Sequence, residues 1–288
     1  MLHLGNLRTA LASWLSARAR GGRWIVRMED VDGPRCRREH GERQLRDLAA
    51  LGLESDAAVL WQSDRGDAYR SALEALHDTD GLYPCACTRR DLALLASAPH
   101  AEDGLRPYPG TCRTRPWEGF DRALRVRLPV GDVAWDDLLL GPQRDDPAAL
   151  TGDPLLFRRD GLFAYHLAVV VDDGAQDITE VVRGADLRPV TATQVRLQEA
   201  LGLTRPGYAH LGLVTAPDGS RLGKREGALG LKELRAKGIA IAEVIGWLGW
   251  SLGCLERPEP CGAEELCPRF GWQSVPRGPI AIPASWSG

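Results

Sequence analysis

Two segments near opposite ends of the sequence contain residue types that bind phosphate groups. Residues 3–6 (HLGN) stand at the start of a helical pattern, and the unpaired N–H groups of a helix N-terminus attract anions. Residues 221–225 (RLGKR) follow Asp218 and Gly219 in a loop, where their cations could stabilise the charge of a departing pyrophosphate. Taken separately, an ordinary helix cap and a solvated basic loop are the alternative interpretations. Together, the two segments predict a nucleotide site.

Cys85, Cys87 and Cys112 indicate a second kind of site, one that binds a metal ion. Thiolates are ligands that zinc prefers, and three of them leave one tetrahedral position to fill. The sequence offers His100, Tyr108 or an open position for it. The alternative is three free thiols, and the odd total of seven cysteines does not indicate a disulfide framework. No role is assigned to Cys36, and Cys254, Cys261 and Cys267 have either no role or, as the alternative, a second metal site in the tail.

Alternating helices and short apolar runs are expected to position these residues. Up to residue 80, the order helix, strand, helix, strand, helix predicts a parallel sheet with crossover helices. From residue 81 the pattern changes to cysteines, prolines and alternating runs such as 123–128, which predicts an inserted, partly antiparallel module. The α/β pattern resumes at residue 160 and is followed by an apolar helix over residues 239–252. Residues 254–288 show no periodicity and are expected to form an irregular tail.

Composition excludes several classes of protein. The chain has 288 residues, of which 44% are apolar and 26% charged, and its net charge is −3. No stretch approaches the ~18 consecutive apolar residues of a membrane helix, and the first residues lack a signal pattern. We therefore expect a cytoplasmic protein without membrane contact. Because the net charge is slightly negative, any contact with nucleic acid has to come from a local basic patch.

The two phosphate-binding segments, separated by a split α/β pattern, resemble the HIGH and KMSKS motifs of the class I aminoacyl-tRNA synthetases. Three longer blocks narrow the resemblance to the glutamyl branch of that family. They are RMEDVDGPR (27–35), DGLFAYHLAVVVDD (160–173) and VRGADL (182–187). The resemblance implies an α/β fold with a Rossmann-like parallel sheet, split by an inserted zinc-containing module and followed by a short C-terminal helical segment.

Within that branch, the sequence is most similar to the glutamyl-Q tRNA(Asp) synthetases, a family of short members that lack an anticodon-binding domain. Only 63 residues (288 − 225) follow Arg225, whereas a full glutamyl-tRNA synthetase has a large helical domain there. The resemblance implies a monomer that activates glutamate with ATP and transfers it to queuosine in the anticodon of tRNA(Asp). The alternatives are a truncated glutamyl-tRNA synthetase core, an inactive relic that binds nucleotide or RNA, and another nucleotidyltransferase of the same superfamily.

The resemblance also implies a role for each residue that matches a family motif. Glu29 would bind the amino group of glutamate, since a desolvated ammonium needs an anionic partner. Arg183 would pair with a substrate carboxylate through its planar fork, and Tyr165 would form a directional hydrogen bond. Lys224 would bind the ATP phosphates, accompanied by Mg²⁺, and would be a catalytic residue together with His3. The other residues expected in the ATP site are Gly5 and Asn6.

The family pattern of C-x-C followed by Y-x-x-x-C matches Cys85, Cys87, Tyr108 and Cys112. The resemblance thus assigns Tyr108 as the fourth ligand of one structural Zn²⁺. A phenol has a free pKa of ~10, but the charge of the ion can offset this. Arginines near the module could bind the phosphates of a tRNA stem, with a solvated surface as the alternative. They are Arg89, Arg90, Arg106, Arg113, Arg115, Arg122, Arg125 and Arg127.

The sequence departs from the family at both phosphate-binding segments. The family's first strand, RxAPSPxGxLH, corresponds here only to residues 1–3. Either the start of the sequence is assigned too late, or a central strand of the sheet, with an Arg and a Ser of the substrate site, is missing. In residues 221–225, Arg replaces the first Lys and Gly replaces the Ser, which removes a hydroxyl donor. The predicted parts are a first α/β half (1–80), the inserted module (81–159), a second α/β half with the basic loop (160–235), and a helix with an irregular tail (236–288).

Overall fold

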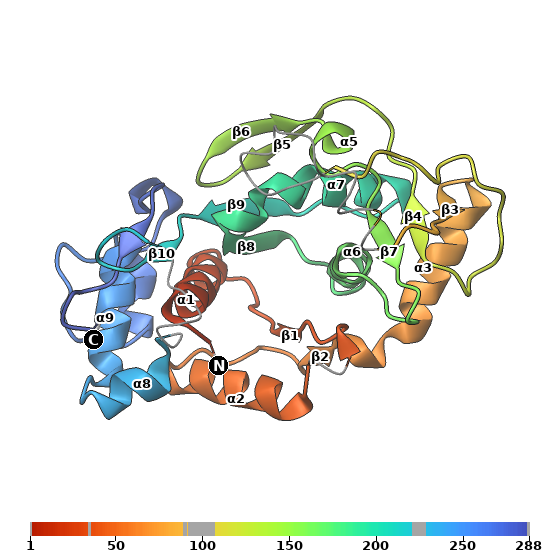
Figure 1. Cartoon of the computed structure of the whole chain (residues 1–288). Helices are drawn as coiled ribbons and strands as arrows, with labels where there is room; N and C mark the ends of the chain where they lie inside the picture. Colours follow the sequence, from red (N-terminus) through yellow and green to blue (C-terminus); the bar gives the residue numbers. More distant parts are fainter. Residues whose placement is uncertain (1, 34–35, 89–90, 92–106, 221–228, 287–288) are drawn as a thin grey trace.

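The structure is a computed structural model that describes residues 2–33, 36–88, 91, 107–220 and 229–286 (Figure 1). It begins with the helix α1 (Leu4–Ala19), which packs on strand β8 and on the C-terminal helices. Leu4, Leu7, Leu11 and Leu15 recur every three to four residues of α1, and none of the four is more than 1% exposed. This apolar stripe is the reason that the segment forms a helix against the core.

The first α/β half follows the predicted order. β1 (Arg27–Met28) and β2 (Leu60–Trp61) form a parallel pair, and α2 (Arg38–Ala50) is the crossover helix between them. The turn η2 (Gln62–Asp64) then leads to α3 (Gly66–Asp78). Because Glu29 follows β1 directly, its carboxylate lies at the carboxyl end of this parallel pair.

A second sheet has the strand order β6-β5-β9-β8. β8 (Glu180–Gly184) and β5 (Val133–Asp137) both run parallel to β9 (Gly207–Leu211), whereas β6 (Gly141–Asp145) is antiparallel to β5. The residues of β5 and β6 fall in the predicted inserted module (81–159), but this pairing joins them to the sheet of the second α/β half. Alternation along a segment identifies a strand and carries no information about the distant strand that pairs with it.

The expected Rossmann-like parallel sheet is divided in the described residues. The parallel pair β1 and β2 belongs to one sheet, while the parallel strands β5, β9 and β8 belong to another. No strand in the described residues pairs with both β1 and β8, so the two sheets are not joined by hydrogen bonds. The parallel direction of these strands is therefore as expected, whereas their membership of a single sheet is not.

The antiparallel part of the inserted module forms a third sheet with the order β3-β4-β7. Its strands are β3 (Leu82–Pro84), β4 (Leu124–Val126) and β7 (Leu155–Phe157), and both pairings are antiparallel, as predicted. The sheet packs on α3 and on α6 (Tyr165–Ala175) through a common apolar core. The remaining helical elements of this region are α5 (Pro147–Leu150), η3 (Ala185–Val190) and α7 (Thr191–Ala200).

The C-terminal residues have little regular structure, as expected, but they pack into the main core. After α8 (Leu231–Ala236) and α9 (Ile241–Ser251), the chain forms η4 (Glu264–Arg269), η5 (Trp272–Ser274) and the strand β11 (Ile280–Ala281). β11 pairs with β10 (Val214–Thr215), and the tail contributes buried side chains to the main core. Single apolar residues in irregular backbone, such as Leu266 with no exposed surface, leave no periodic signal in the sequence. None of the described helices combines the length and the apolar character of a membrane span.

Candidate functional site

The residues predicted to bind glutamate come from three different elements and lie close together. Glu29 follows β1, Tyr165 begins α6 and Arg183 belongs to β8. Besides burial, the charge of Glu29 raises the pKa of Tyr165 and the charge of Arg183 lowers it. Arg183 also acts to lower the pKa of Glu29. The carboxyl ends of parallel strands are a common place for ligand sites in α/β proteins, and β1 and β8 both contribute here.

Glu29 combines solvent access with a desolvating surrounding. Its side chain is 44% exposed, yet desolvation by the surrounding protein raises its pKa. Arg27 offsets this effect only in part, since its Nη2 lies 3.8 Å from Glu29 and only 2.6 Å from the carboxylate of Asp173. Glu29 therefore keeps an accessible carboxylate that favours a cationic ligand.

Arg183 is a buried guanidinium, only 8% exposed, whose hydrogen bonds all go to uncharged groups in the described residues. Its Nε donates to Nε2 of His210 at 3.0 Å. Its Nη1 donates to Oε1 of Gln194 at 2.7 Å, and its Nη2 to Oγ1 of Thr191 at 2.8 Å. These bonds use three of the five N–H donors of the side chain. The arrangement leaves a positive charge suited to the carboxylate of a ligand.

Tyr165 and His166 are the first two residues of α6. Burial and the negative charge of Glu29 raise the pKa of Tyr165, so its hydroxyl stays protonated and can donate a hydrogen bond. Burial lowers the pKa of His166 to about 4, and the charge of Arg183 acts in the same direction. Nδ1 of His166 is buried without a hydrogen-bond partner in the described residues. A neutral imidazole is therefore available beside the glutamate-site residues.

His3, Gly5 and Asn6 are brought together at the N-terminus of α1. Nδ1 of His3 accepts a hydrogen bond from the backbone N–H of Asn6 at 3.3 Å, and Oδ1 of Asn6 accepts one from the N–H of His3 at 3.2 Å. A Cβ at Gly5 would lie 2.9 Å from the His3 ring, so only glycine lets the ring cover this end of the helix. Burial lowers the pKa of His3, although the carboxylate of Asp186 opposes the effect. Asp186 follows β8, so this end of α1 lies near the end of that strand.

Residues 221–228, which include Lys224 and the other basic residues of the second phosphate-binding segment, lie outside the described residues. The chain after them returns to the start of α1. The backbone N–H of Leu4 donates to the carbonyl of Leu229 at 3.0 Å, and Gly230 forms an antiparallel bridge with His3. Leu229 and Gly230, which follow the second predicted phosphate-binding segment, are thus joined to the N-terminus of α1 by backbone contacts at His3 and Leu4.

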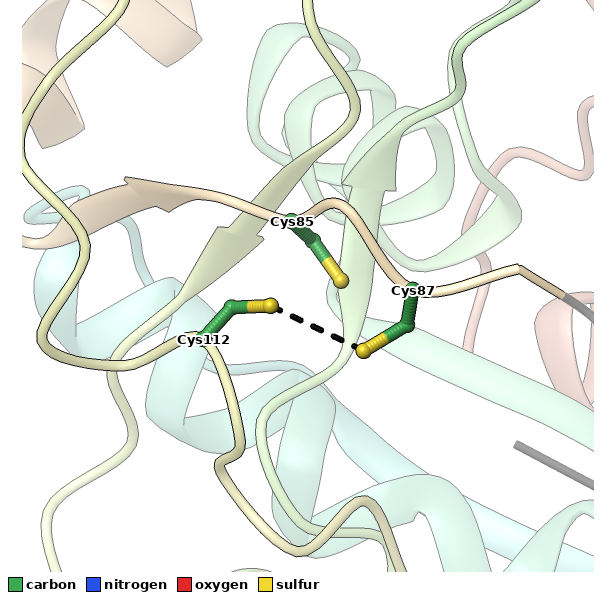
Figure 2. A group of neighbouring side chains, drawn as sticks. All are labelled: Cys85, Cys87 and Cys112. Carbon is green, nitrogen blue, oxygen red and sulfur yellow. Dashed lines mark hydrogen bonds between the residues drawn. The ribbon is translucent and has the colours of Figure 1, made fainter. Parts of the chain in front are cut away.

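Cys85, Cys87 and Cys112 form a thiol cluster that could hold a metal ion, and their Sγ atoms point toward one another (Figure 2). The three Sγ atoms lie within 4.8 Å of one another, and the shortest separation is 3.6 Å between Cys87 and Cys112. Tetrahedral bonds of ~2.3 Å to zinc would place sulfur atoms about 3.8 Å apart. The hydroxyl of Tyr108 lies 3.7 Å from Sγ of both Cys85 and Cys87. His100 lies outside the described residues.

Polar neighbours of the thiol cluster favour one thiolate. Burial opposes ionisation of Cys112, but hydrogen bonds from the backbone of Ala86 and from Tyr108 outweigh it and lower the pKa of the thiol to about 7. Burial raises the pKa of Cys87 to about 11 and also raises the pKa of Tyr108. A divalent cation would reverse these last two shifts, because it favours the ionised form of each ligand.

Each arginine of the set near this module that the structure describes has a partner within the protein, although Arg113, Arg115 and Arg122 also keep exposed surface. Arg125 is only 7% exposed and donates to Sγ of Cys85 at 3.3 Å and to the carbonyl of Asp153 at 2.6 Å. Arg113 also binds Asp153, whereas Arg115 and Arg122 both bind Glu118. Arg127 donates to the carbonyls of Asp80 and Arg113. Arg89, Arg90 and Arg106 lie outside the described residues.

Sequence reasoning missed the residues that hold Arg183. These residues lie in three elements: Asp137 in β5, Thr191 and Gln194 in α7, and His210 in β9. Between Asp137 and Thr191, the next of them along the chain, lie 53 residues (190 − 137). The only local signal is a polar residue in an otherwise apolar strand, such as His210 in YAHL. A polar residue of this kind indicates a buried hydrogen bond without naming its partner.

A cavity of about 250 Å³ opens at the opposite end of β8. It is lined by residues of α1, by Trp24 and Ile25 before β1, and by Glu180 at the start of β8. None of the predicted site residues lines it. This cavity is therefore separate from the candidate site at Arg183.

Comparison with known proteins gives the same family as the sequence motifs. Residues 1–276 match the family of catalytic domains of class I tRNA synthetases (E and Q). The glutamyl-Q tRNA(Asp) synthetase of Symbiobacterium thermophilum is 44% identical over 300 residues, which cover 98% of this chain and 93% of that protein. The protein of the same name from Geobacter sulfurreducens is 47% identical over 255 residues, covering 87% of this chain and 81% of its own length.

Solved structures show a similar fold. The crystal structure of glutamate-tRNA synthetase from Elizabethkingia anophelis has a TM-score of 0.84 and 25% identity, and the match covers 99% of this chain. A glutamate tRNA ligase from Elizabethkingia meningosepticum in complex with its amino acid has a TM-score of 0.83 at the same identity and coverage. This chain covers 66% and 65% of those two chains, slightly less than two thirds of their length.

Proposed function

The chain belongs to the class I tRNA synthetases (E and Q), and we propose that it activates glutamate with ATP and transfers the glutamyl group to queuosine in the anticodon of tRNA(Asp). The observation that carries this proposal is that the opposite charges of Glu29 and Arg183 are near enough to act on each other and on the hydroxyl of Tyr165. An anionic group and a cationic group in one site suit an amino acid that has an additional carboxylate.

Glutamate binding follows from these charges. Glu29 binds the ammonium of the substrate, and Arg183 binds its side-chain carboxylate through the N–H donors that Thr191, Gln194 and His210 leave over. Tyr165 donates its hydroxyl proton to the same ligand. Because Arg183 has no anionic hydrogen-bond partner among the described residues, a neutral glutamine side chain would offset less of its charge than glutamate does.

ATP binds at the N-terminus of α1 in this proposal. The helix N-terminus and the ring of His3 face the phosphates, while Gly5 leaves room for this ring and Asn6 keeps it in place. Lys224 binds the phosphates from residues 221–228, whose following residue, Leu229, is bonded to Leu4. Mg²⁺ accompanies the triphosphate, and no side chain is assigned to it.

The reaction has two steps, and positioning accounts for most of the catalysis. An oxygen of the α-carboxylate of glutamate attacks the α-phosphorus of ATP, and the bond to pyrophosphate breaks. A hydroxyl of the queuosine cyclopentenediol then attacks the carbonyl carbon of the adenylate, AMP leaves, and the hydroxyl proton is released. His3 and Lys224 stabilise the negative charge that moves onto pyrophosphate in the first step.

We also propose that the thiol cluster holds one structural Zn²⁺, with Cys85, Cys87, Cys112 and Tyr108 as its four ligands. The separations of the sulfur atoms and the depressed pKa of Cys112 fit this ion. The ion would connect the segment after β3 to the segment around Tyr108, and it takes no part in glutamyl transfer. We expect the protein to act as a monomer in the cytoplasm.

The experiment that tests this function measures two reactions of the purified full chain. Glutamate-dependent exchange of pyrophosphate into ATP, without tRNA, reports the first step. Transfer of labelled glutamate to tRNA(Asp) with and without queuosine reports the second step. Labelling that requires queuosine supports the proposal, whereas labelling of the terminal adenosine of tRNA(Glu) supports a truncated glutamyl-tRNA synthetase. A properly folded chain without exchange would indicate a relic that only binds nucleotide or RNA.

A further inference from the structure

A chain of buried polar side chains crosses three neighbouring strands beneath the glutamate site. Asp137 ends β5, His210 lies in β9, and Arg183 lies in β8 directly opposite His210 in the parallel register. The exposed fractions of these three side chains are 3%, 0% and 8%. Nδ1 of His210 lies 2.6 Å from Oδ2 of Asp137, and Nε2 of the same ring accepts the Nε–H of Arg183 at 3.0 Å.

The hydrogen bonds of Asp137 determine which ring nitrogen of His210 carries the proton. Oδ1 of Asp137 accepts the backbone N–H groups of Leu139 at 2.9 Å and Leu140 at 2.8 Å. Burial opposes ionisation of Asp137, but these bonds and the one from His210 outweigh it and lower its pKa. An ionised carboxylate only accepts, so the proton of the imidazole lies on Nδ1. Nε2 then has a lone pair for Arg183, and burial keeps the ring neutral by lowering its pKa.

We propose that Asp137 and His210 are positioning residues for Arg183, which hold its guanidinium in the orientation that binds the carboxylate of the amino-acid substrate. This inference rests on the proposed function, because it assumes that Arg183 binds glutamate. Nothing in the proposal requires His210 or Asp137 to touch the substrate. Thr191 and Gln194 fix the terminal nitrogens of the guanidinium, and His210 fixes its Nε.

A neutral imidazole between the two charges has a specific advantage over direct contact. A carboxylate bonded to Arg183 would orient the guanidinium but would also offset its positive charge. The imidazole is oriented by its hydrogen bond to Asp137 and in turn orients Arg183, and it separates the carboxylate from the guanidinium by the width of the ring. The charge of Arg183 is thereby preserved for the substrate, and glutamate is favoured over glutamine.

Asp137→Asn tests the proposal with little change in volume. The two backbone N–H groups on Oδ1 require an oxygen at that position, so the amide nitrogen faces Nδ1 of His210. The ring then carries its proton on Nε2, which opposes the Nε–H of Arg183. We expect the KM for glutamate to rise about ten- to hundredfold, the KM for ATP to stay within about twofold, and the preference for glutamate over glutamine to fall by a similar factor.

His210→Gln and His210→Leu separate positioning from packing. The amide oxygen of glutamine lies the same number of bonds from Cα as Nε2 of histidine, so His210→Gln still offers an acceptor to Arg183. We expect His210→Gln to keep the KM for glutamate within about threefold of the parent and His210→Leu to raise it about ten- to hundredfold. The matched control is Tyr83→Phe. It removes a buried 2.7 Å hydrogen bond from Tyr83, in strand β3 of another sheet, to Asp153, and it should leave the KM for glutamate and the KM for ATP unchanged.

Glutamate-dependent pyrophosphate exchange is measured for all four variants, with the active fraction of each determined from its burst of adenylate. Asp137→Asn and His210→Gln both conserve shape, so the test does not depend on the folding of His210→Leu. The proposal would be overturned if Asp137→Asn raised the KM for ATP as much as the KM for glutamate, or if it left the KM for glutamate unchanged. Failure of the parent chain itself to exchange pyrophosphate would overturn the proposed function instead.

Discussion

The guanidinium carbon of Arg125 lies 3.6 Å from the centroid of the Tyr108 ring, and Nε of the same arginine donates to Sγ of Cys85 at 3.3 Å. One buried cation therefore contacts two of the four groups assigned to the metal site. A Zn²⁺ ion with three thiolates and a phenolate has a net charge of −2, which a buried arginine partly neutralises. This contact also explains why Arg125 is unavailable to RNA.

We expect Arg125→Met to weaken metal binding about ten- to hundredfold, since partners of metal ligands typically contribute that much to affinity. The thioether fills most of the same space but donates no hydrogen bond to Cys85 and carries no charge. Competition with a zinc chelator measures the affinity. Arg115→Met, at an exposed arginine that binds Glu118, is the control and should have the parent affinity.

Replacement of a thiol in the cluster should remove the metal. Cys112→Ser is expected to abolish stoichiometric zinc and to lower the melting temperature, because the ion stabilises the folded chain that binds it. Cys261→Ser changes a half-buried cysteine outside the cluster and should retain one zinc per chain. Metal content by mass spectrometry and thermal unfolding are the measurements. One zinc per chain in Cys112→Ser would contradict the ligand assignment.

Arg183→Lys keeps the charge but loses the planar fork of donors, and lysine cannot satisfy His210, Gln194 and Thr191 together. We expect the KM for glutamate to rise about tenfold or more, because a hydrogen bond to a charged group contributes about 1.5–3 kcal/mol. The KM for ATP should change little. Steady-state pyrophosphate exchange at varied glutamate provides the measurement, and a parallel loss of ATP affinity would argue against this role.

Glutamate binding should weaken on acidification. Glu29 must be ionised to bind the substrate ammonium, and its pKa is raised by burial. As the pH falls through this raised pKa, Glu29 gains a proton and the KM for glutamate increases, at a pH above the usual pKa of about 4.3. Glu29→Gln should have a higher KM that depends less on pH over the same range. A pH series of KM for glutamate in both proteins tests this, and identical profiles would exclude Glu29.

Lys224→Ala should slow glutamate activation by about 10²- to 10³-fold, which is the typical cost of losing one preorganised donor to a developing negative charge. Lys232→Ala changes an exposed lysine at the start of α8 and should leave activation unchanged. Single-turnover formation of the adenylate measures the step directly. Activation by Lys224→Ala near the parent rate would remove this lysine from the mechanism.

Local patterns were sufficient for those parts of the fold that depend on local spacing. The leucines of α1 recur at helical intervals, so that helix could be predicted almost to its ends. The hydrogen bond between Arg183 and His210 could not be predicted, because it requires β8 and β9 to pair in one specific register. For the fourth zinc ligand, the spacing alone left Tyr108 as one of three candidates, and only the resemblance to a family selected it.

The pairing of β10 with β11 also has a consequence for folding during synthesis. Val214 and Ile280 are register partners separated by 66 positions (280 − 214), and Gly212 lies so close to the carbonyl of Gly278 that no side chain fits there. A ribosome that has completed the basic residues 221–225 must still add more than fifty residues before β10 finds its neighbour. The contact between β10 and β11 can therefore form only after residues 278–281 have been synthesised and have left the ribosome, so this part of the fold is completed after the rest.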